Sequence, residues 1–363
     1  MNKNKRPVWN SGSTYSLEHS FEWNVQNGPT FHGDVPEIPE TDAKEFFGYR
    51  VGSRFGLAAS LGLSADWIDL YARLGFDILT YKTVRKQARL AHPHPNWKFV
   101  KPGTSLLTNA PQIAMDGLPD DPGQATAVGS LGMPSTSPDF WQKDIRRARE
   151  RLLKNQVLIV SVVATSRPDM SADEFVAEFE ELADRVREAG ADIVEANFSC
   201  PNVSRSEGEV FHDSELSGRI AAALRRGAGK LPVLVKVGEF ESDAQRTSFL
   251  QSVNGNASGV VMINGPSRVI LDERGNEAFG PSRSRAGLMG GDVFEIALNS
   301  VRSAVGVVER DKLALQIVAV GGASTPQRIR KLIDAGACAA LAASPAAWNP
   351  FLAIQTKLAD PSV

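Results

Sequence analysis

Short apolar runs alternate with amphipathic segments from Phe55 to the end of the chain. The runs are rich in β-branched residues and the segments between them repeat apolar residues at helical spacing, which is typical of βα units around a parallel sheet. Eight runs over about 300 residues predict a closed (β/α)8 TIM barrel of the α/β class, with a doubly wound sheet as the alternative. The expected strands are Phe55–Ala59, Phe76–Lys82, Val157–Ala164, Asp192–Asn197, Val233–Val237, Gly259–Asn264, Leu315–Val320 and Ala339–Ala343.

The segment after the third run shows how the helices are marked. Ser171 and Glu174 have the spacing of a capping box, and Gly190 is a stop signal. Between them, apolar residues recur at the spacing of one helix face: Phe175, Phe179, Leu182 and Val186. The pattern predicts a helix that packs on the sheet.

Two parts of the chain do not fit the repeat. Residues 1–50 are polar and Pro-rich, carry Trp9 and Trp23, and have no sustained period. They are predicted to be an extension packed on a barrel domain of residues 51–363. The stretch from Thr83 to Pro138 is too long for an ordinary connection. It predicts an insertion after the second strand.

Composition narrows the functional class. With 40 basic and 42 acidic residues, the chain is not expected to carry the long-range positive electrostatic field that attracts nucleic acid or anionic lipid. A small-molecule substrate fits this balance of charge better than either of those partners. Cys200 and Cys338 form neither a disulfide framework nor a metal spacing, and His92-Pro93-His94 is poor ligand spacing, so no metal site is predicted. No apolar run reaches the ~20 residues of a membrane span. A cytoplasmic protein without a membrane partner is expected.

Polar residues gather at the ends of the expected strands. Each of them alone has a plain explanation as a cap, a turn or a satisfied core group. The loops after the strands form the active face of a TIM barrel, however, and so many polar residues there predict a site. They are Ala59-Ser60, Lys82-Thr83, Asn197 to Asn202, Lys236 within an apolar run, and Asn264-Gly265.

The fourth strand leads into the most informative stretch. Asn197 and Asn202 flank Cys200, and Pro201 restricts the cysteine to an extended conformation. An asparagine offers a flat heterocycle both a donor and an acceptor. The stretch predicts a proton-transfer group among amides, whereas the plainer interpretation of a lone cysteine is a buried structural thiol.

Glycine turns follow later strands. A turn of backbone amides with a helix N-terminus behind it is the usual phosphate site after strands seven and eight of such barrels. The candidates are Gly290 and Gly291, then Gly321 and Gly322 after the seventh strand, and Ser344 after the eighth.

These residues in this order resemble the dihydroorotate dehydrogenase family from about Phe55 onward, and are also similar to the pyrimidine domain of dihydropyrimidine dehydrogenase. A cysteine at position 200 and Lys82-Thr83 after the second strand look like the soluble class 1 branch. The resemblance implies a flavin mononucleotide (FMN) cofactor. It also implies an oxidoreductase that acts on a CH–CH bond, with hydride transfer to flavin N5 and Cys200 as the general base. Soluble members are commonly homodimers.

The resemblance also implies residue roles. Catalysis would use Cys200 and Lys236. Cofactor contacts would come from Ala59, Ser60, Lys82, Thr83, Asn197, Lys236 and Asn264, with Gly290, Gly291, Gly321, Gly322 and Ser344 at the ribityl phosphate. Substrate contacts would come from Lys82, Gly132, Met133, Asn197, Asn202, Asn264 and Gly265.

Three positions depart from the family pattern. Gly129 replaces an asparagine that helps to bind the orotate carboxylate, Gly265 replaces a hydroxyl residue, and Ala343 replaces a phosphate-site glycine. The substrate therefore stays open among dihydroorotate, another dihydropyrimidine and a non-pyrimidine. A flavin-binding barrel without turnover is the remaining alternative. The electron acceptor is not readable from the sequence.

Overall fold

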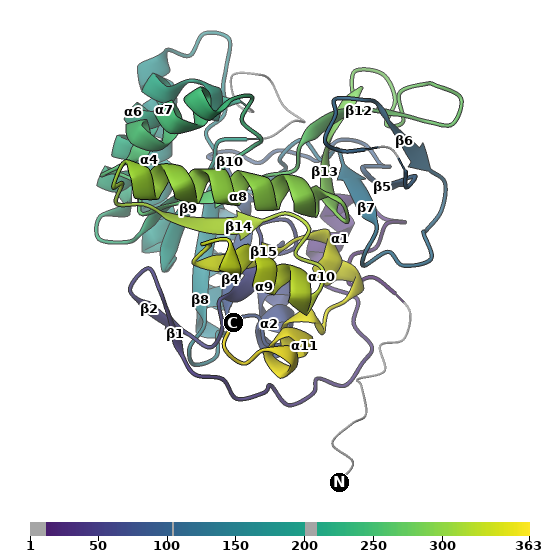
Figure 1. Cartoon of the computed structure of the whole chain (residues 1–363). Helices are drawn as coiled ribbons and strands as arrows, with labels where there is room; N and C mark the ends of the chain where they lie inside the picture. Colours follow the sequence, from purple (N-terminus) through teal and green to yellow (C-terminus); the bar gives the residue numbers. More distant parts are fainter. Residues whose placement is uncertain (1–11, 104, 200–208) are drawn as a thin grey trace.

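Eight parallel strands form a closed barrel in the computed structural model, which describes residues 12–103, 105–199 and 209–363. Their order around the barrel is β3-β4-β8-β9-β10-β11-β14-β15, so that β15 pairs with β3 (Figure 1). The (β/α)8 prediction is confirmed. The strands are β3 Phe55–Leu57, β4 Ile78–Val84, β8 Val157–Val162, β9 Ile193–Asn197, β10 Val233–Val237, β11 Gly259–Met262, β14 Gln316–Val320 and β15 Ala339–Ala342.

All eight expected strands exist, with shifted ends. β4 runs past the expected end at Lys82 to Val84, and its register against β8 shifts between Tyr81 and Val84. Lys82 and Thr83 therefore lie within an irregular strand end and not in the following loop. A β-bulge of this kind re-aims side chains at the rim of a barrel.

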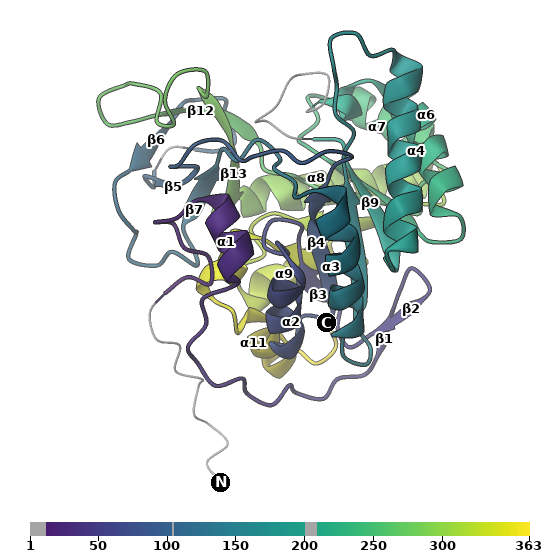
Figure 2. The same ribbon diagram turned by 180° about the vertical axis from the view of Figure 1, so that it is seen from behind.

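Helices surround the barrel (Figures 1 and 2). The predicted capping box of α4 is present, with Ser171 and Glu174 bonding each other's backbone amides. The buried face of α4 includes all four expected apolar residues. The helices are α2 Ala65–Arg73, α3 Pro138–Glu150, α4 Ala172–Glu188, α6 Ser214–Ala228, α7 Asp243–Val253, α8 Val293–Arg310, α9 Pro326–Asp334, α10 Ser344–Trp348 and α11 Leu352–Ala359, with a 3-10 turn at Val210–His212.

A hairpin closes the amino-terminal end of the barrel. Strands β1 (Lys44–Phe46) and β2 (Tyr49–Val51) pair antiparallel, and Phe46 is fully buried in the same cluster as barrel residues of β8 to β11. Phe47 packs over Gly259, where an added Cβ would lie 2.6 Å from the ring. Because side chains fill this end of the barrel, an open site can form only at the other end, where the strands have their carboxyl ends.

A second, smaller sheet stands beside that open end. It combines β5 (Trp97–Val100), β6 (Gln112–Met115) and β7 (Thr126–Gly129) with β12 (Ser267–Leu271) and β13 (Arg285–Gly290), as the upper right of Figure 1 shows. The first three strands form the predicted insertion. The last two come from a second insertion after β11, which the sequence did not reveal because its strands are short and paired with distant partners.

The N-terminal segment contains a helix that the sequence did not predict, α1 (Phe21–Asn27), capped by Ser20. Seven residues are too few to display a repeating period. The segment lies against α2 (Figure 2): Thr14 bonds Tyr71 through their hydroxyls at 2.8 Å, and the indole of Trp67 donates to the Asn24 carbonyl. A division of the chain at residue 50 stays a prediction.

Candidate functional site

A cavity opens at the carboxyl ends of the barrel strands. Residues from the barrel, from the small sheet and from the two glycine turns all reach it. The lining consists of Ala58, Ala59, Ser60, Lys82, Thr83, Gly129, Leu131, Met133, Asn197, Lys236, Ile263, Asn264, Gly265, Gly287, Leu288, Met289, Gly290, Val293, Val320, Gly321, Gly322, Ala343 and Pro345.

A buried ion pair stands at one side of this cavity. Strand register sets Lys236 of β10 opposite Asn197 of β9, so the two side chains project at the same level. Lys236 Nζ lies 3.3 Å from Glu195 Oε1, and the two residues are only 6% and 1% exposed. A buried ammonium requires such a partner, because an unpaired buried charge is strongly destabilising.

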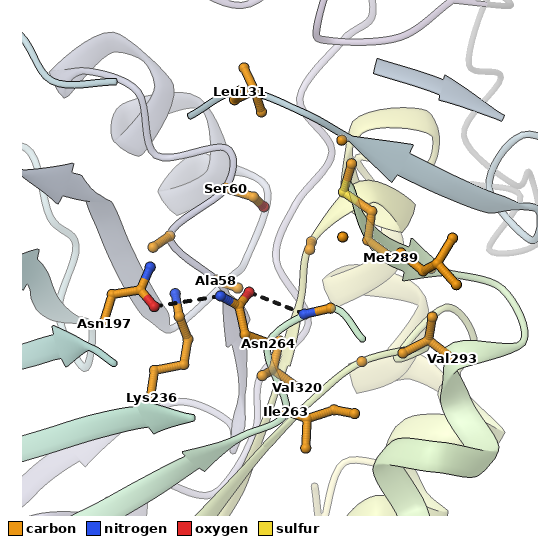
Figure 3. A pocket seen from close by; sticks show the side chains of 18 of the residues that line it. Ala58, Ser60, Leu131, Asn197, Lys236, Ile263, Asn264, Met289, Val293 and Val320 are labelled. Atoms are coloured by element: carbon orange, nitrogen blue, oxygen red, sulfur yellow. Dashed lines mark hydrogen bonds between the residues drawn. The ribbon is translucent and has the colours of Figure 1, made fainter. Parts of the chain in front are cut away.

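Amides extend the polar side. Asn197 Oδ1 accepts from the Ser199 amide at 3.2 Å and from Asn264 Nδ2 at 3.5 Å. Asn264 also donates to the Ser199 carbonyl, and its Oδ1 accepts from the Gly265 amide at 3.2 Å. These bonds fix the two side-chain amides relative to each other, and Figure 3 shows them next to the Lys236 ammonium.

Hydroxyl groups from the first two barrel strands face the same space. The Thr83 and Ser161 hydroxyls lie 3.0 Å apart, which fixes the irregular end of β4 against β8. The Ser60 Oγ is buried and has no hydrogen-bond partner among the described residues. A buried hydroxyl without a partner has lost hydration without compensation, and this one borders the cavity.

The glycine turns form the opposite end. Gly290, Gly321 and Gly322 have φ values of +71°, +121° and +66°, which side-chain-bearing residues rarely adopt. A Cβ at Gly322 would lie 2.4 Å from the Phe294 backbone, and one at Gly290 would lie 2.7 Å from the Ser344 Oγ. The Ser344 Oγ is a second buried hydroxyl without a partner in the described structure.

Arg328 joins the two turns from behind. Its Nη1 donates at 3.0 Å both to the Gly291 carbonyl and to the Ser324 hydroxyl, and its guanidinium lies over the Phe294 ring at 5.1 Å. The Gly291 turn is also held by Thr126, whose Oγ1 accepts from the Asp292 amide at 3.0 Å. Both turns are therefore fixed in position without a ligand.

The remaining wall is apolar. Figure 3 shows Met289 and Val293 on the side of the cavity away from Asn197 and Lys236, with Ile263 and Val320 below. A cavity with polar groups on one side and apolar groups on the other suits a flat, amphipathic ring system.

Most of the sequence-predicted site residues meet in this cavity. The lining includes Ala59, Ser60, Lys82, Thr83, Met133, Asn197, Lys236, Asn264, Gly265, Gly290, Gly321 and Gly322. Three others lie behind it: Gly132 faces the His92 ring, Gly291 faces Thr126, and Ser344 lies beneath Gly290. Cys200 and Asn202 lie outside the described residues.

Sequence reasoning missed two contributors. Glu195 was not recognised as the partner of Lys236, although its position two residues before Asn197 places both on the inner face of β9. Met289 was not recognised as part of the cavity lining. It reaches the cavity because β13 pairs with β7, which no local pattern indicates.

The second cysteine lies away from this cavity. Cys338 is partly buried at the opposite end of the barrel, and burial raises the pKa of its thiol to about 12. Within the described ranges no three metal-binding side chains cluster. The helices there are all too short or too polar to span a bilayer.

The cavity and the glycine turns lie at the carboxyl ends of the barrel strands, which is where (β/α)8-barrel proteins bind their ligands. The fold and the site therefore define a ligand-binding (β/α)8-barrel protein. The sequence profile of the dihydroorotate dehydrogenase family matches residues 43–349. The chain therefore belongs to the dihydroorotate dehydrogenase family, an oxidoreductase family acting on CH–CH bonds.

Individual relatives agree with this assignment. The chain is 28% identical to the dihydroorotate dehydrogenase of Dictyostelium discoideum over 94% of this chain and 95% of that protein. A shorter stretch is 34% identical to the NAD-dependent dihydropyrimidine dehydrogenase subunit PreA of Escherichia coli K12, over 33% of this chain and 27% of that protein. The crystal structure of the Eimeria tenella dihydroorotate dehydrogenase in complex with ferulenol superposes with a TM-score of 0.71 at 17% identity, covering 93% of this chain and 87% of that one.

Proposed function

We propose that this protein is an FMN-dependent dehydrogenase or reductase that acts on dihydroorotate or a related dihydropyrimidine. The observation that carries the proposal is the composition of one cavity. Its glycine turns suit a phosphate, and its amides and ammonium suit a flat, hydrogen-bonding ring. Family membership supplies the reaction class.

The residues present fit FMN. One buried hydroxyl without a partner in the described structure, Ser60 Oγ, borders the cavity, where a ligand would complete its hydrogen bonding, and a second, Ser344 Oγ, lies behind the turn at Gly290. The turns at Gly290 and Gly321-Gly322 leave no room for side chains, and they line the cavity, so a ligand would lie against their backbone. They precede α8 and α9, whose N-termini favour an anion. Ala343, in place of a glycine, lines the cavity without closing it.

When bound, the flavin would accept two electrons from the substrate. The chain would supply orientation and electrostatics. Lys236 is held at a fixed place by Glu195, so its ammonium would stabilise negative charge that develops on the ring system beside it. Asn197 and Asn264 would hold the substrate ring in one orientation, since their amides are already fixed by Ser199 and Gly265.

The proton would be removed by Cys200. Two observations support this role: the place of Cys200 in the Asn-Phe-Ser-Cys-Pro-Asn motif, and the position of Asn197, three residues before it, in the cavity lining. A thiol of ordinary pKa ~8.5 is a usable base near neutrality, whereas a serine hydroxyl is far weaker. On the sequence alone, a cytoplasmic location and a homodimer stay predictions, and the electron acceptor is open.

The test is the absorbance spectrum of the purified protein, followed by anaerobic mixing with dihydroorotate, dihydrouracil and dihydrothymine. We expect a yellow protein whose flavin absorbance bleaches with at least one of these donors. Colourless protein that binds no FMN when offered it would refute the proposal. A flavin that dithionite reduces but no dihydropyrimidine bleaches would indicate a binding protein or a non-pyrimidine substrate.

Cys200→Ser tests the proton-transfer role. We expect flavin reduction to slow by at least about a hundredfold near neutral pH, because general-base catalysis contributes about 10²–10⁴-fold. Cys338→Ser is the matched control, since that thiol is at the opposite end of the barrel and should leave the rate unchanged. An unchanged rate in Cys200→Ser would remove the cysteine from the mechanism.

A further inference from the structure

A buried guanidinium joins three segments at the open end of the barrel. Arg85 follows β4 directly and is only 1% exposed. Its Nε donates to the Met133 carbonyl at 3.0 Å, and its Nη1 donates to the Ala164 carbonyl at 3.3 Å and to the Thr165 hydroxyl at 2.9 Å. Met133 lies in the loop after β7, whereas Ala164 and Thr165 follow β8. One side chain therefore fixes this loop to the ends of two barrel strands.

Met133 has an unusual backbone conformation that needs such support. Its φ is +50°, and Gly132 before it has φ +76°. A residue with a side chain rarely adopts this left-handed region and keeps it only where surrounding contacts enforce it. Two residues further on, the Ser135 hydroxyl accepts from the Arg85 amide at 3.0 Å, and the backbone of Ser135 pairs with Arg89. The Arg85 guanidinium adds the bond at Met133 itself.

The Met133 side chain continues this connection to the polar side of the cavity. Asn197 Nδ2 donates to the Met133 sulfur at 3.4 Å, and both residues are buried and line the cavity. Asn197 Oδ1 already accepts from the Ser199 amide and from Asn264 Nδ2. A thioether sulfur is a weak acceptor, so this contact orients the Asn197 amide but holds it less firmly than a carbonyl oxygen would.

We propose that Arg85 is a positioning residue for the substrate ring: it fixes Met133, and Met133 holds the Asn197 amide in the orientation that a bound ring requires. This inference rests on the proposed function. Arg85 is not part of the cavity lining, so it acts through Met133 and not by contact with the ring. A carbonyl oxygen of the ring replaces the sulfur as acceptor for Asn197 Nδ2. Because the amide is oriented before binding, less order has to be created when the ring binds.

The experiment titrates orotate and uracil against the flavin spectrum of the FMN-loaded protein, in the wild type and in Arg85→Lys. Lysine keeps the charge but has one donor nitrogen, so it cannot reproduce the fork that reaches Met133 and Thr165 together. We expect the dissociation constant of the ring to rise at least about tenfold, since loss of a hydrogen bond to a charged group costs about that factor. The affinity for FMN should change less, because Arg328 and Thr126 hold the glycine turns.

Rapid anaerobic mixing with dihydroorotate and dihydrouracil separates binding from chemistry. In Arg85→Lys, the donor concentration that gives half the maximal rate of flavin reduction should rise by the same factor as the dissociation constant. The limiting rate should stay near that of the wild type, because the bound ring itself then holds the Asn197 amide. A lower limiting rate with an unchanged half-saturating concentration would overturn the inference.

Two variants test whether Arg85 acts through Met133. Thr165→Val removes another acceptor of Arg85 and leaves the Met133 bond, so the ring should bind as in the wild type. Met133→Leu removes the sulfur at nearly the same volume and should weaken ring binding by itself. Combined with Arg85→Lys, it should cost little more than the larger single loss, because both changes interrupt one connection. Losses that multiply, or an equal loss in Thr165→Val, would overturn the inference.

The inference and the proposed function fail in different ways. If the wild-type protein binds neither orotate nor uracil and no dihydropyrimidine bleaches its flavin, the proposed function fails and the inference fails with it. If the wild type binds a ring and Arg85→Lys binds it equally well, the inference alone is wrong. Should Arg85→Lys not fold, the comparison of Met133→Leu with Thr165→Val decides, and equal ring affinity in these two variants would overturn the inference.

Discussion

Substitution of Gly322 by alanine tests whether the second glycine turn is as tightly determined as the structure indicates. Gly322 has φ +66°, and an added Cβ would lie 2.4 Å from both Cα and Cβ of Phe294 and 2.5 Å from its amide nitrogen. The Cα and the amide nitrogen are backbone atoms at the start of α8, and the Cβ is bonded directly to that backbone, so none of the three can move aside as the end of a flexible side chain would. Either α8 or the turn must shift.

The expected magnitude follows from two costs. A left-handed conformation costs a side-chain-bearing residue about 1–2 kcal/mol, and overpacking in a dense interior costs about 1–3 kcal/mol. Gly322→Ala should therefore lower the free energy of unfolding by about 2–5 kcal/mol. Because Phe294 lies under the Arg328 guanidinium that holds the other turn, the affinity for FMN should fall as well.

The assay is urea unfolding of the apo protein, together with titration of FMN against protein fluorescence. Gly306→Ala is the matched control: this glycine is exposed on α8, has nothing within 4 Å of an added Cβ, and should gain about 0.5–1 kcal/mol. If Gly322→Ala unfolds at the same urea concentration as Gly306→Ala and binds FMN equally well, the argument from close packing is wrong.

Three further predictions concern Arg328, the Lys236–Glu195 ion pair and the second thiol. Arg328→Met removes the bond to the Gly291 carbonyl and should weaken FMN binding more than riboflavin binding, as measured by titration; equal losses for both ligands would contradict a role at the phosphate turn. Glu195→Gln leaves Lys236 buried without a counter-ion and should lower the free energy of unfolding of the apo protein by about 3–5 kcal/mol, as measured by urea unfolding. Adding Lys236→Met should recover most of that loss, because it removes the unpaired charge. No recovery would argue against the ion pair. Burial raises the Cys338 pKa from 9.0 to about 12, so the unfolded chain loses this proton first and stability should fall between pH 9 and pH 12 by up to about 1.4 kcal/mol per pH unit. Cys338→Ala should reduce the slope of unfolding free energy against pH between pH 9 and pH 12. An unchanged slope in this variant would show that the thiol is not its source.

The barrel could be predicted from the sequence because its strands and helices leave patterns in short stretches of the chain. Strands that are buried on both faces appear as continuous apolar runs, and the Ser171 capping box marks the start of α4, the helix after β8. The site was readable for a related reason. Polar residues such as Asn197, Lys236 and Asn264 interrupt apolar runs at strand ends, and the closed barrel brings all strand ends to one face.

The small sheet was not readable, because its pairing depends on segments far apart in the chain. β7 and β13 meet although four barrel strands, β8 to β11, lie between Gly129 and Gly287 in the sequence, and no short pattern encodes such a contact. The same holds for Thr83, whose place in an irregular strand end depends on the register with β8.

By itself, therefore, the sequence determined the barrel, the face that carries chemistry and most of the polar residues that meet there, since each follows from burial pattern and strand order. Only the tertiary structure decided what those residues face. It paired Lys236 with Glu195 across neighbouring strands and set Met289 over Gly129 from a distant insertion. The physical reason is that the lining of the cavity depends on through-space packing between separate segments, whereas secondary structure depends on neighbours along the chain.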